Sequence, residues 1–163
     1  MVQGGRMIIR EIRAAGLRGE TPAGGWSHEL TPTDVVHTLI SVHTSEGLVG
    51  VGSVFTSEAL VLASLELLKD QFIGESAIEP IRVSEKLHQN TFWQGRGGAV
   101  TNTISGIDIA LWDILGQVTK QPLSRLLGGR YRDKVRPYAS VLMQEPKDLI
   151  PVLNKLKDQG FTA

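Results

Sequence analysis

The spacing of the apolar residues changes near Ser57, and that change limits the folds that this chain can adopt. Before Ser57 the pattern has a period of two: Val36, Ile40 and Val42 fall on one face of a strand over residues 35–44. After Ser57 the apolar residues recur every three or four positions, which is typical of amphipathic helices. Strands followed by helices predict an α+β protein with a small antiparallel sheet.

Three strands are expected, over residues 7–14, 35–44 and 48–56. The second and third are joined by the turn Ser45-Glu46-Gly47, and two strands across a short glycine-containing turn form a hairpin. Gly50 and Gly52 lie inside the third strand, where glycine often marks the close approach of another backbone.

Helices and one further strand follow. The helices expected are one capped by Ser57, one starting at Pro80, a long one near residues 99–119, a short one over 122–127 and one over 146–159. The long helix carries the stripe Ile104, Ile107, Leu111, Trp112, Leu115 and Val118. A strand over 135–142 precedes the last helix, so the end of the chain resembles half of a βαβ unit. We therefore expect a disordered leader over 1–6, one domain over 7–130 and the start of a second over 131–163.

The composition excludes several classes of protein. Hydrophobic residues make up 41% of the chain, which excludes disorder, and there are no cysteines for disulfides or thiol catalysis. No apolar run approaches the roughly 18 residues of a membrane span, so no membrane partner is expected. Nucleic acid is not expected either, because the pI of 6.9 is far from basic and residues 125–136 fit a solvated face or a charged seam. The expected location is the cytoplasm.

The residues alone predict no catalytic centre and no metal site. Glu85 and His88 form the Glu-x-x-His unit of di-iron bundles, but such a site needs a second copy, so a hydrogen bond within the helix is expected. His37 and His43 share a strand face about 20 Å apart, too far to share a metal. Asp108 and Asp113 lie roughly 140° apart on the long helix, so we expect each to pair with a different neighbour.

Two segments could bind a ligand. The loop over residues 15–34 carries Trp26, Ser27, His28 and Glu29, and a polar loop with an aromatic residue can contact a ligand or pack on its own Trp26. The turn at 95–98 precedes a helix, so its free N–H groups and Arg96 could hold an anion; otherwise it is a tight turn between helices.

Several segments together resemble the enolase superfamily, in its mandelate racemase/muconate lactonizing enzyme branch. The resemblance is carried by SGIDIALWDILG (105–116), then by residues 121–123, 126–129 and 135–140, and by the hairpin TSEGLVGVG (44–52). Residues 26–29 and 87–98 resemble the galactonate dehydratase-like proteins within that branch. This similarity implies an enolase-type N-terminal capping domain over 7–130, with a three-stranded antiparallel meander and a helical bundle. The first β/α unit of an incomplete TIM barrel would follow it.

In that family, two mobile loops of the capping domain close over the barrel and select the substrate. The resemblance assigns the first loop to residues 15–34, with Trp26, Ser27, His28 and Glu29, and the second to Phe55 and Thr56. The barrel supplies the chemistry: Mg²⁺ stabilises an enediolate, a lysine or histidine removes the proton α to the carboxylate, and a dehydratase expels the β-hydroxyl. The match ends before these barrel residues, so we expect no catalytic residue, metal site or cofactor in this chain, and Mg²⁺ in the full-length family enzyme.

The favoured interpretation is the substrate-specifying N-terminal part of an acid-sugar dehydratase or racemase. It implies a sugar-acid substrate bound through the missing barrel, a homo-oligomer, and no activity of this chain alone. One alternative is a stand-alone, non-enzymatic capping domain that binds a partner or a sugar acid, and another is an interaction module without a small ligand. A strand and helix over 135–159, and an end inside Gly-Phe-Thr-Ala, favour a truncated enzyme.

Overall fold

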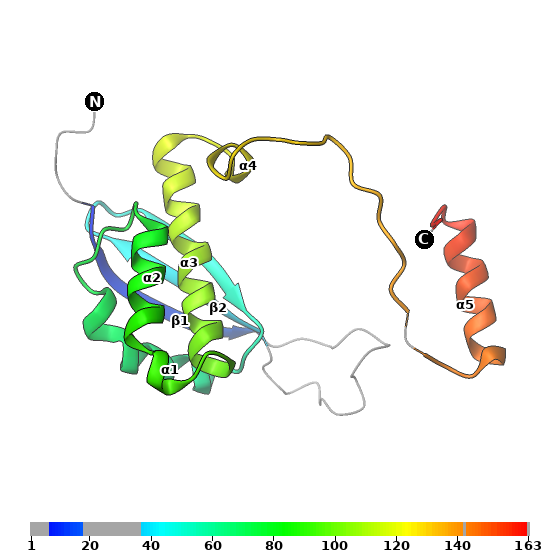
Figure 1. Ribbon diagram of the computed structural model, residues 1–163, viewed down its shortest axis with the longest axis horizontal. Coiled ribbons are helices and arrows are strands. Elements are labelled where there is room, and N and C mark those ends of the chain that lie inside the picture. The colour runs from blue at the N-terminus through cyan, green and yellow to red at the C-terminus, as the bar shows by residue number, and fades with distance from the viewer. Residues whose placement is uncertain (1–6, 18–36, 142, 163) are drawn as a thin grey trace. The chain divides into compact units, whose positions relative to one another are not determined.

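Figure 1 shows the computed structural model of the protein, which describes residues 7–17, 37–141 and 143–162. The leader expected over residues 1–6 lies outside the described residues, as do Trp26, Ser27, His28 and Glu29. The described residues divide into two units, one containing residues 7–17 and 37–129 and the other containing residues 130–162.

The first unit contains the expected three-stranded antiparallel sheet, in the order β1 (Ile9–Leu17), β2 (His37–Thr44) and β3 (Val49–Val54). β2 and β3 pair in one continuous register, with Ile40 opposite Gly52, whereas the register of β1 on β2 shifts between Ile9 and Glu11 and is regular after that, with Ala14 opposite Ile40. β1 begins later than expected, because Met7 and Ile8 pair instead with the segment between the first two helices: the Ala77 N–H donates to the Met7 carbonyl at 2.9 Å. The predicted hairpin of β2 and β3 is confirmed.

The helices are close to their predicted positions. They are α1 (Glu58–Phe72), α2 (Pro80–Asn90), the 3₁₀ turn η1 (Phe92–Gln94), α3 (Gly98–Thr119), α4 (Leu123–Leu126) and α5 (Pro146–Asp158). Ser57 occupies the N-cap of α1, but its side chain makes no capping hydrogen bond. Pro80 is at the start of α2, where its missing N–H leaves no helical hydrogen bond unmade.

The core lies between one face of the sheet and the helices α1, α2 and α3 (Figure 1). β2 presents alternate residues to it, so Ile40 and Val42 are fully buried. In α3 the predicted stripe is buried at Ile104, Ile107 and Leu111. Trp112 is only half-buried, and Ile114 takes its place because it lies seven residues beyond Ile107, on the same helical face.

Glycines let α3 lie directly on β3, as Gly50 and Gly52 predicted. A Cβ atom on Gly52 would collide with the Gly106 carbonyl oxygen, and one on Gly50 with the Ala110 carbonyl oxygen. From the helix side, a Cβ on Gly106 would lie 2.6 Å from Val54 Cγ1 and 2.7 Å from Ile40 Cδ1. No side chain fits between the strand and the helix, so their backbones set the distance between the two layers.

A small charged cluster joins the loop after α1 to α2. The Glu75 carboxylate accepts hydrogen bonds from Lys86 Nζ and Arg82 Nη1, both at 2.7 Å. The Glu75 carbonyl accepts from the Ile9 N–H at 2.9 Å, so the same residue also holds the start of β1. The Lys86 hydrogen bond is the main cause that lowers the pKa of the Glu75 carboxyl below its ordinary value, and the charge of Arg82 acts in the same direction.

The second unit contains α5 but not the strand expected over residues 135–142. Residues 135–141 are not in a strand, and residue 142 lies outside the described residues. The reason is physical: a strand exists through hydrogen bonds to a neighbouring strand, and the described part of the chain gives this segment none. Within the unit, Arg136 Nη2 donates to the Thr162 carbonyl at 2.8 Å and to Thr162 Oγ1 at 2.7 Å.

Replacing Gly52 with alanine is expected to destabilise the protein by about 2–3 kcal/mol, because the new methyl group must push α3 away from β3. Urea unfolding followed by circular dichroism measures this change. Gly97→Ala is the matched control, since a Cβ there meets nothing within 4 Å, and its cost should stay within about 0.5 kcal/mol. Equal costs for the two variants would contradict the packing described for α3.

The stabilising contribution of Glu75 is expected to be lost in acid. Because its folded pKa lies below the ordinary value of 4.5, its contribution is complete above pH 4.5 and is lost as the pH falls through the lower folded value. Unfolding free energies of the wild type and Glu75→Gln at pH 7 and pH 3 measure this. The difference between the two proteins should shrink at pH 3. A constant difference would show that Glu75 does not act through its charge.

Candidate functional site

The turn between β3 and α1 presents the two described residues of the predicted substrate loops, Phe55 and Thr56. Phe55 leaves the end of β3 with 66% of its surface exposed. Its ring packs edge-on against the ring of His37, with the centroids 4.9 Å apart and the planes at 77°. Phe55 is therefore an exposed aromatic ring that is held in place by a second ring.

Thr56 is fixed by one side chain from the sheet and one from α3. Thr38 Oγ1 donates to the Thr56 carbonyl at 2.8 Å, and Thr38 is fully buried. Asn102 Nδ2 donates to Thr56 Oγ1 at 3.0 Å. The turn that carries Phe55 is therefore tied to both layers of the fold.

Three residues of this site were not predicted from the sequence: His37, Thr38 and Asn102. His37 was expected only to lie in a strand, too far from His43 to share a metal. It is the first residue of β2, and it follows directly in sequence the segment that contains the predicted first loop. Asn102 could have been found from the sequence, because it belongs to a stripe of polar residues along α3.

That stripe is formed by Asn102, Asp113 and Gln117, which share with Gly106 the face of α3 that lies along β3. Their spacings of four, seven and four residues bring them to one side of a helix. Asp113 Oδ2 accepts from the Val51 N–H at 3.0 Å, and Gln117 Nε2 donates to the Val49 carbonyl at 2.9 Å. Asp113 and Gln117 thus satisfy backbone groups on the outer edge of β3.

Asp108 points to a different element, as its angular separation from Asp113 predicted. It accepts a hydrogen bond from Ser84 Oγ of α2 at 2.8 Å. Both aspartates of α3 therefore join secondary-structure elements, and they do not form an acid–base pair. In the part of the chain that the structure describes, no three His, Cys, Asp or Glu side chains are grouped to hold a metal ion.

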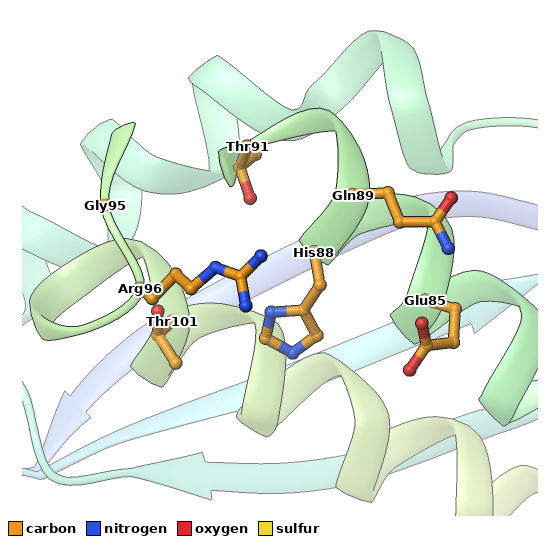
Figure 2. Close-up of a pocket in the computed structure, with 7 residues that line it drawn as sticks. All are labelled: Glu85, His88, Gln89, Thr91, Gly95, Arg96 and Thr101. Carbon is orange, nitrogen blue, oxygen red and sulfur yellow. The ribbon is translucent and has the colours of Figure 1, made fainter. Parts of the chain in front are cut away.

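Apart from the β3–α1 turn, a hollow with a volume of about 270 Å³ lies at the turn before α3. It is lined by Glu85, His88, Gln89, Thr91, Gly95, Arg96 and Thr101 (Figure 2). Figure 2 shows the Arg96 guanidinium directed towards the His88 ring. The hydrogen bond expected between Glu85 and His88 does not form: each residue lines the hollow separately.

Two of the residues that line this hollow, Thr91 and Arg96, make contacts with the protein itself. Thr91 is buried, but its hydroxyl already donates to the Leu87 carbonyl at 2.7 Å. Arg96 lies over the Phe92 ring, 6.0 Å from its centroid. Residues 95–98 connect η1 to α3, as both alternatives predicted for this turn require.

Comparison with known proteins agrees with the fold. Residues 29–128 match the model of the mandelate racemase / muconate lactonizing enzyme N-terminal domain. A D-galactonate dehydratase from Pectobacterium atrosepticum is 36% identical over 125 residues, which cover 76% of this chain and 32% of that protein. The chain thus spans about a third of the length of the curated relatives it matches.

Solved structures give the same answer. The 3,6-anhydro-D-galactonate cycloisomerase from Zobellia galactanivorans superposes with a TM-score of 0.75 at 26% identity, over 94% of this chain and 41% of that one. A mandelate racemase/muconate lactonizing enzyme-like protein from Rubrobacter xylanophilus gives a TM-score of 0.74 at 25% identity, over 98% of this chain and 41% of that one.

Among the described residues, no helix is both long enough and apolar enough to cross a bilayer.

Proposed function

The chain belongs to the mandelate racemase/muconate lactonizing enzyme family of the enolase superfamily, through its N-terminal domain, and from this we propose that it selects the substrate of an acid-sugar dehydratase or racemase. The observation that carries the proposal is the exposed Phe55, tied through Thr56 to the sheet and to α3. A residue that selects a substrate must be accessible and also held in place, and Phe55 meets both conditions.

The similar proteins support a sugar acid as the substrate class. One is a D-galactonate dehydratase and another is a 3,6-anhydro-D-galactonate cycloisomerase, so both act on galactonate or a derivative of it. The reaction proposed for the complete enzyme begins with removal of the proton α to the carboxylate. The β-hydroxyl then leaves in a dehydratase.

The described residues do not fit the Mg²⁺ that this family chemistry implies. Their carboxylates are separated or used in structural contacts: Asp108 binds Ser84, Asp113 binds Val51, and Glu75 binds Lys86. We therefore assign no chemical step to this chain. Its proposed part is to position and exclude substrates, through Phe55 and Thr56 and through the loop with Trp26, Ser27, His28 and Glu29.

Residues 131–163 are proposed to begin the barrel, as its first β/α unit. α5 supports this, because a helix that follows the first barrel strand is the order of such a unit. The Arg136–Thr162 hydrogen bonds support it as well, since they bring the start of the proposed first strand beside the residues that would enter the second. In a complete barrel, residues 135–141 would gain strand neighbours, which the described part of the chain does not give them.

A stand-alone capping domain that binds a partner or a sugar acid remains the second candidate, favoured by the self-contained core of the first unit. Two measurements on the protein as its own gene encodes it separate the candidates: its intact mass, and its dehydration of a panel of sugar acids with Mg²⁺. Release of a 2-keto acid product supports the enzyme. A mass near 17.7 kDa without turnover supports the binding domain. Sizing of the same sample tests the proposed homo-oligomer.

Phe55→Ala is expected to change the substrate preference of the active protein about tenfold, measured as the ratio of kcat/KM values for two sugar acids. Its stability should fall by only about 1 kcal/mol, because an exposed ring loses one aromatic contact. The matched control is Phe92→Ala, which removes an exposed phenylalanine from the turn before α3. Trp26→Ala is predicted to act like Phe55→Ala. Unchanged preference across the panel would refute the assignment of these loops.

Residues 1–163 produced alone are expected to self-associate. Val141 is 38% exposed and Leu153 is 43% exposed, while Leu149 and Leu156 of α5 are half-buried, so the second unit presents an apolar surface. Size-exclusion chromatography and binding of the dye ANS measure this, and Leu153→Ser should reduce both signals while Asn154→Ser leaves them unchanged. A monodisperse wild-type monomer that does not bind ANS would count against the barrel proposal.

A further inference from the structure

We infer that Asn102 is a positioning residue for the β3–α1 turn, and that it sets the direction in which Phe55 projects. The inference rests on the proposed function, because it gives Asn102 a part in substrate selection through that turn. Asn102 Nδ2 donates to Thr56 Oγ1 at 3.0 Å, and Thr56 follows Phe55 directly in the chain.

The turn has two side-chain anchors. Thr38 Oγ1 holds the Thr56 carbonyl at 2.8 Å, which fixes one point of the backbone. The bond from Asn102 reaches the Thr56 side chain from the helical layer. Two bonds from different layers, at different atoms of one residue, restrain its orientation as well as its position.

Asn102 can act as a support because the helix that carries it packs directly on β3. It lies four residues before Gly106, about one helical turn away. At Gly106 the helix backbone lies against the side chains of Ile40 and Val54, since an added Cβ would be 2.7 Å from Ile40 Cδ1 and 2.6 Å from Val54 Cγ1. A displacement of α3 towards the sheet would therefore meet core atoms at once.

The choice of asparagine here has no local explanation within α3. Asparagine favours helix formation less than alanine does. Other polar residues of α3, Thr103 and Ser105, donate to carbonyls of their own helix four residues earlier. The Asn102 amide instead bonds outside its helix, to Thr56.

The contact between Phe55 and His37 depends on the same restraint. The edge-on geometry, with the ring planes at 77°, requires one orientation of the Phe55 ring relative to β2. Rotation of the turn would break that geometry. Loss of Asn102 should therefore release the Phe55 ring, although Asn102 is not in contact with it.

Hydrogen–deuterium exchange of the protein as its own gene encodes it tests the positioning. Asn102→Ala should speed exchange of the peptide that contains Phe55 and Thr56 about fivefold, the factor expected from one lost hydrogen bond. Exchange in β1 should stay unchanged. The same substitution on α2, Asn90→Ala, is the matched control and should leave both segments as in the wild type. The inference would be overturned if the exchange rate around Thr56 in Asn102→Ala equalled that of the wild type, or if exchange became faster by the same factor throughout the sheet.

Rescue variants separate this bond from a general effect of the substitution. Asn102→Asp should restore slow exchange, because its carboxylate can accept from the Thr56 hydroxyl, and Thr56→Ser should keep the bond. Thr56→Val should match Asn102→Ala, and the double variant should be no faster than either single variant. Additive effects would mean that the two residues act separately, and would overturn the inference.

Steady-state kinetics test whether Asn102 acts in substrate selection. In the active protein, Asn102→Ala should raise KM for the preferred sugar acid about fivefold while kcat changes less than about twofold, the pattern of a contact that binds the substrate equally in the ground state and the transition state. A fall in kcat at constant KM, or no change in either, would overturn it. If the wild type converts no sugar acid, the proposed function has failed, whereas the exchange experiments still decide whether Asn102 positions the turn.

Discussion

The fold depends on the contact between α3 and β3, where glycines replace side chains. In most two-layer proteins, interlocking side chains set the spacing between helix and sheet, and they tolerate small shifts. Here Gly50 and Gly52 bring the strand against the carbonyl groups of Gly106 and Ala110. The position of α3 is consequently fixed by backbone atoms, and the polar residues along its face can form specific hydrogen bonds with β3 and with the turn that follows it.

This contact explains how the capping domain can be rigid and still present an exposed turn. The buried residues Ile40, Ile104 and Ile107 stabilise the two layers, while Thr38 and Asn102 connect each layer to Thr56. Phe55 projects from the edge of this support without being part of the core. A substitution at Phe55 can therefore alter this exposed surface at small cost to the fold, which suits its proposed part in substrate selection.

Most of the fold could be predicted from the sequence, because its signals are local. The alternation in β2, the glycine turn, Pro80 and the apolar stripe of α3 each determine structure within a few residues. The strand expected over 135–142 is not formed, since a strand requires a neighbour that no local pattern can supply. His37 and Asn102 were missed for the same reason: their partners are 18 and 46 positions away in the sequence.

Asp113 and Gln117 have a further consequence for how the sheet can grow. They occupy the Val51 N–H and the Val49 carbonyl, which an incoming strand would need for pairing with β3. Any peptide that adds to this sheet must therefore displace both side chains or join at β1. The helix thus closes the β3 edge of the sheet. Among the described residues, the outer edge of β1 is paired at its start, where Ile9 bonds Gly74 and Glu75, so that strand addition to this domain has a direction.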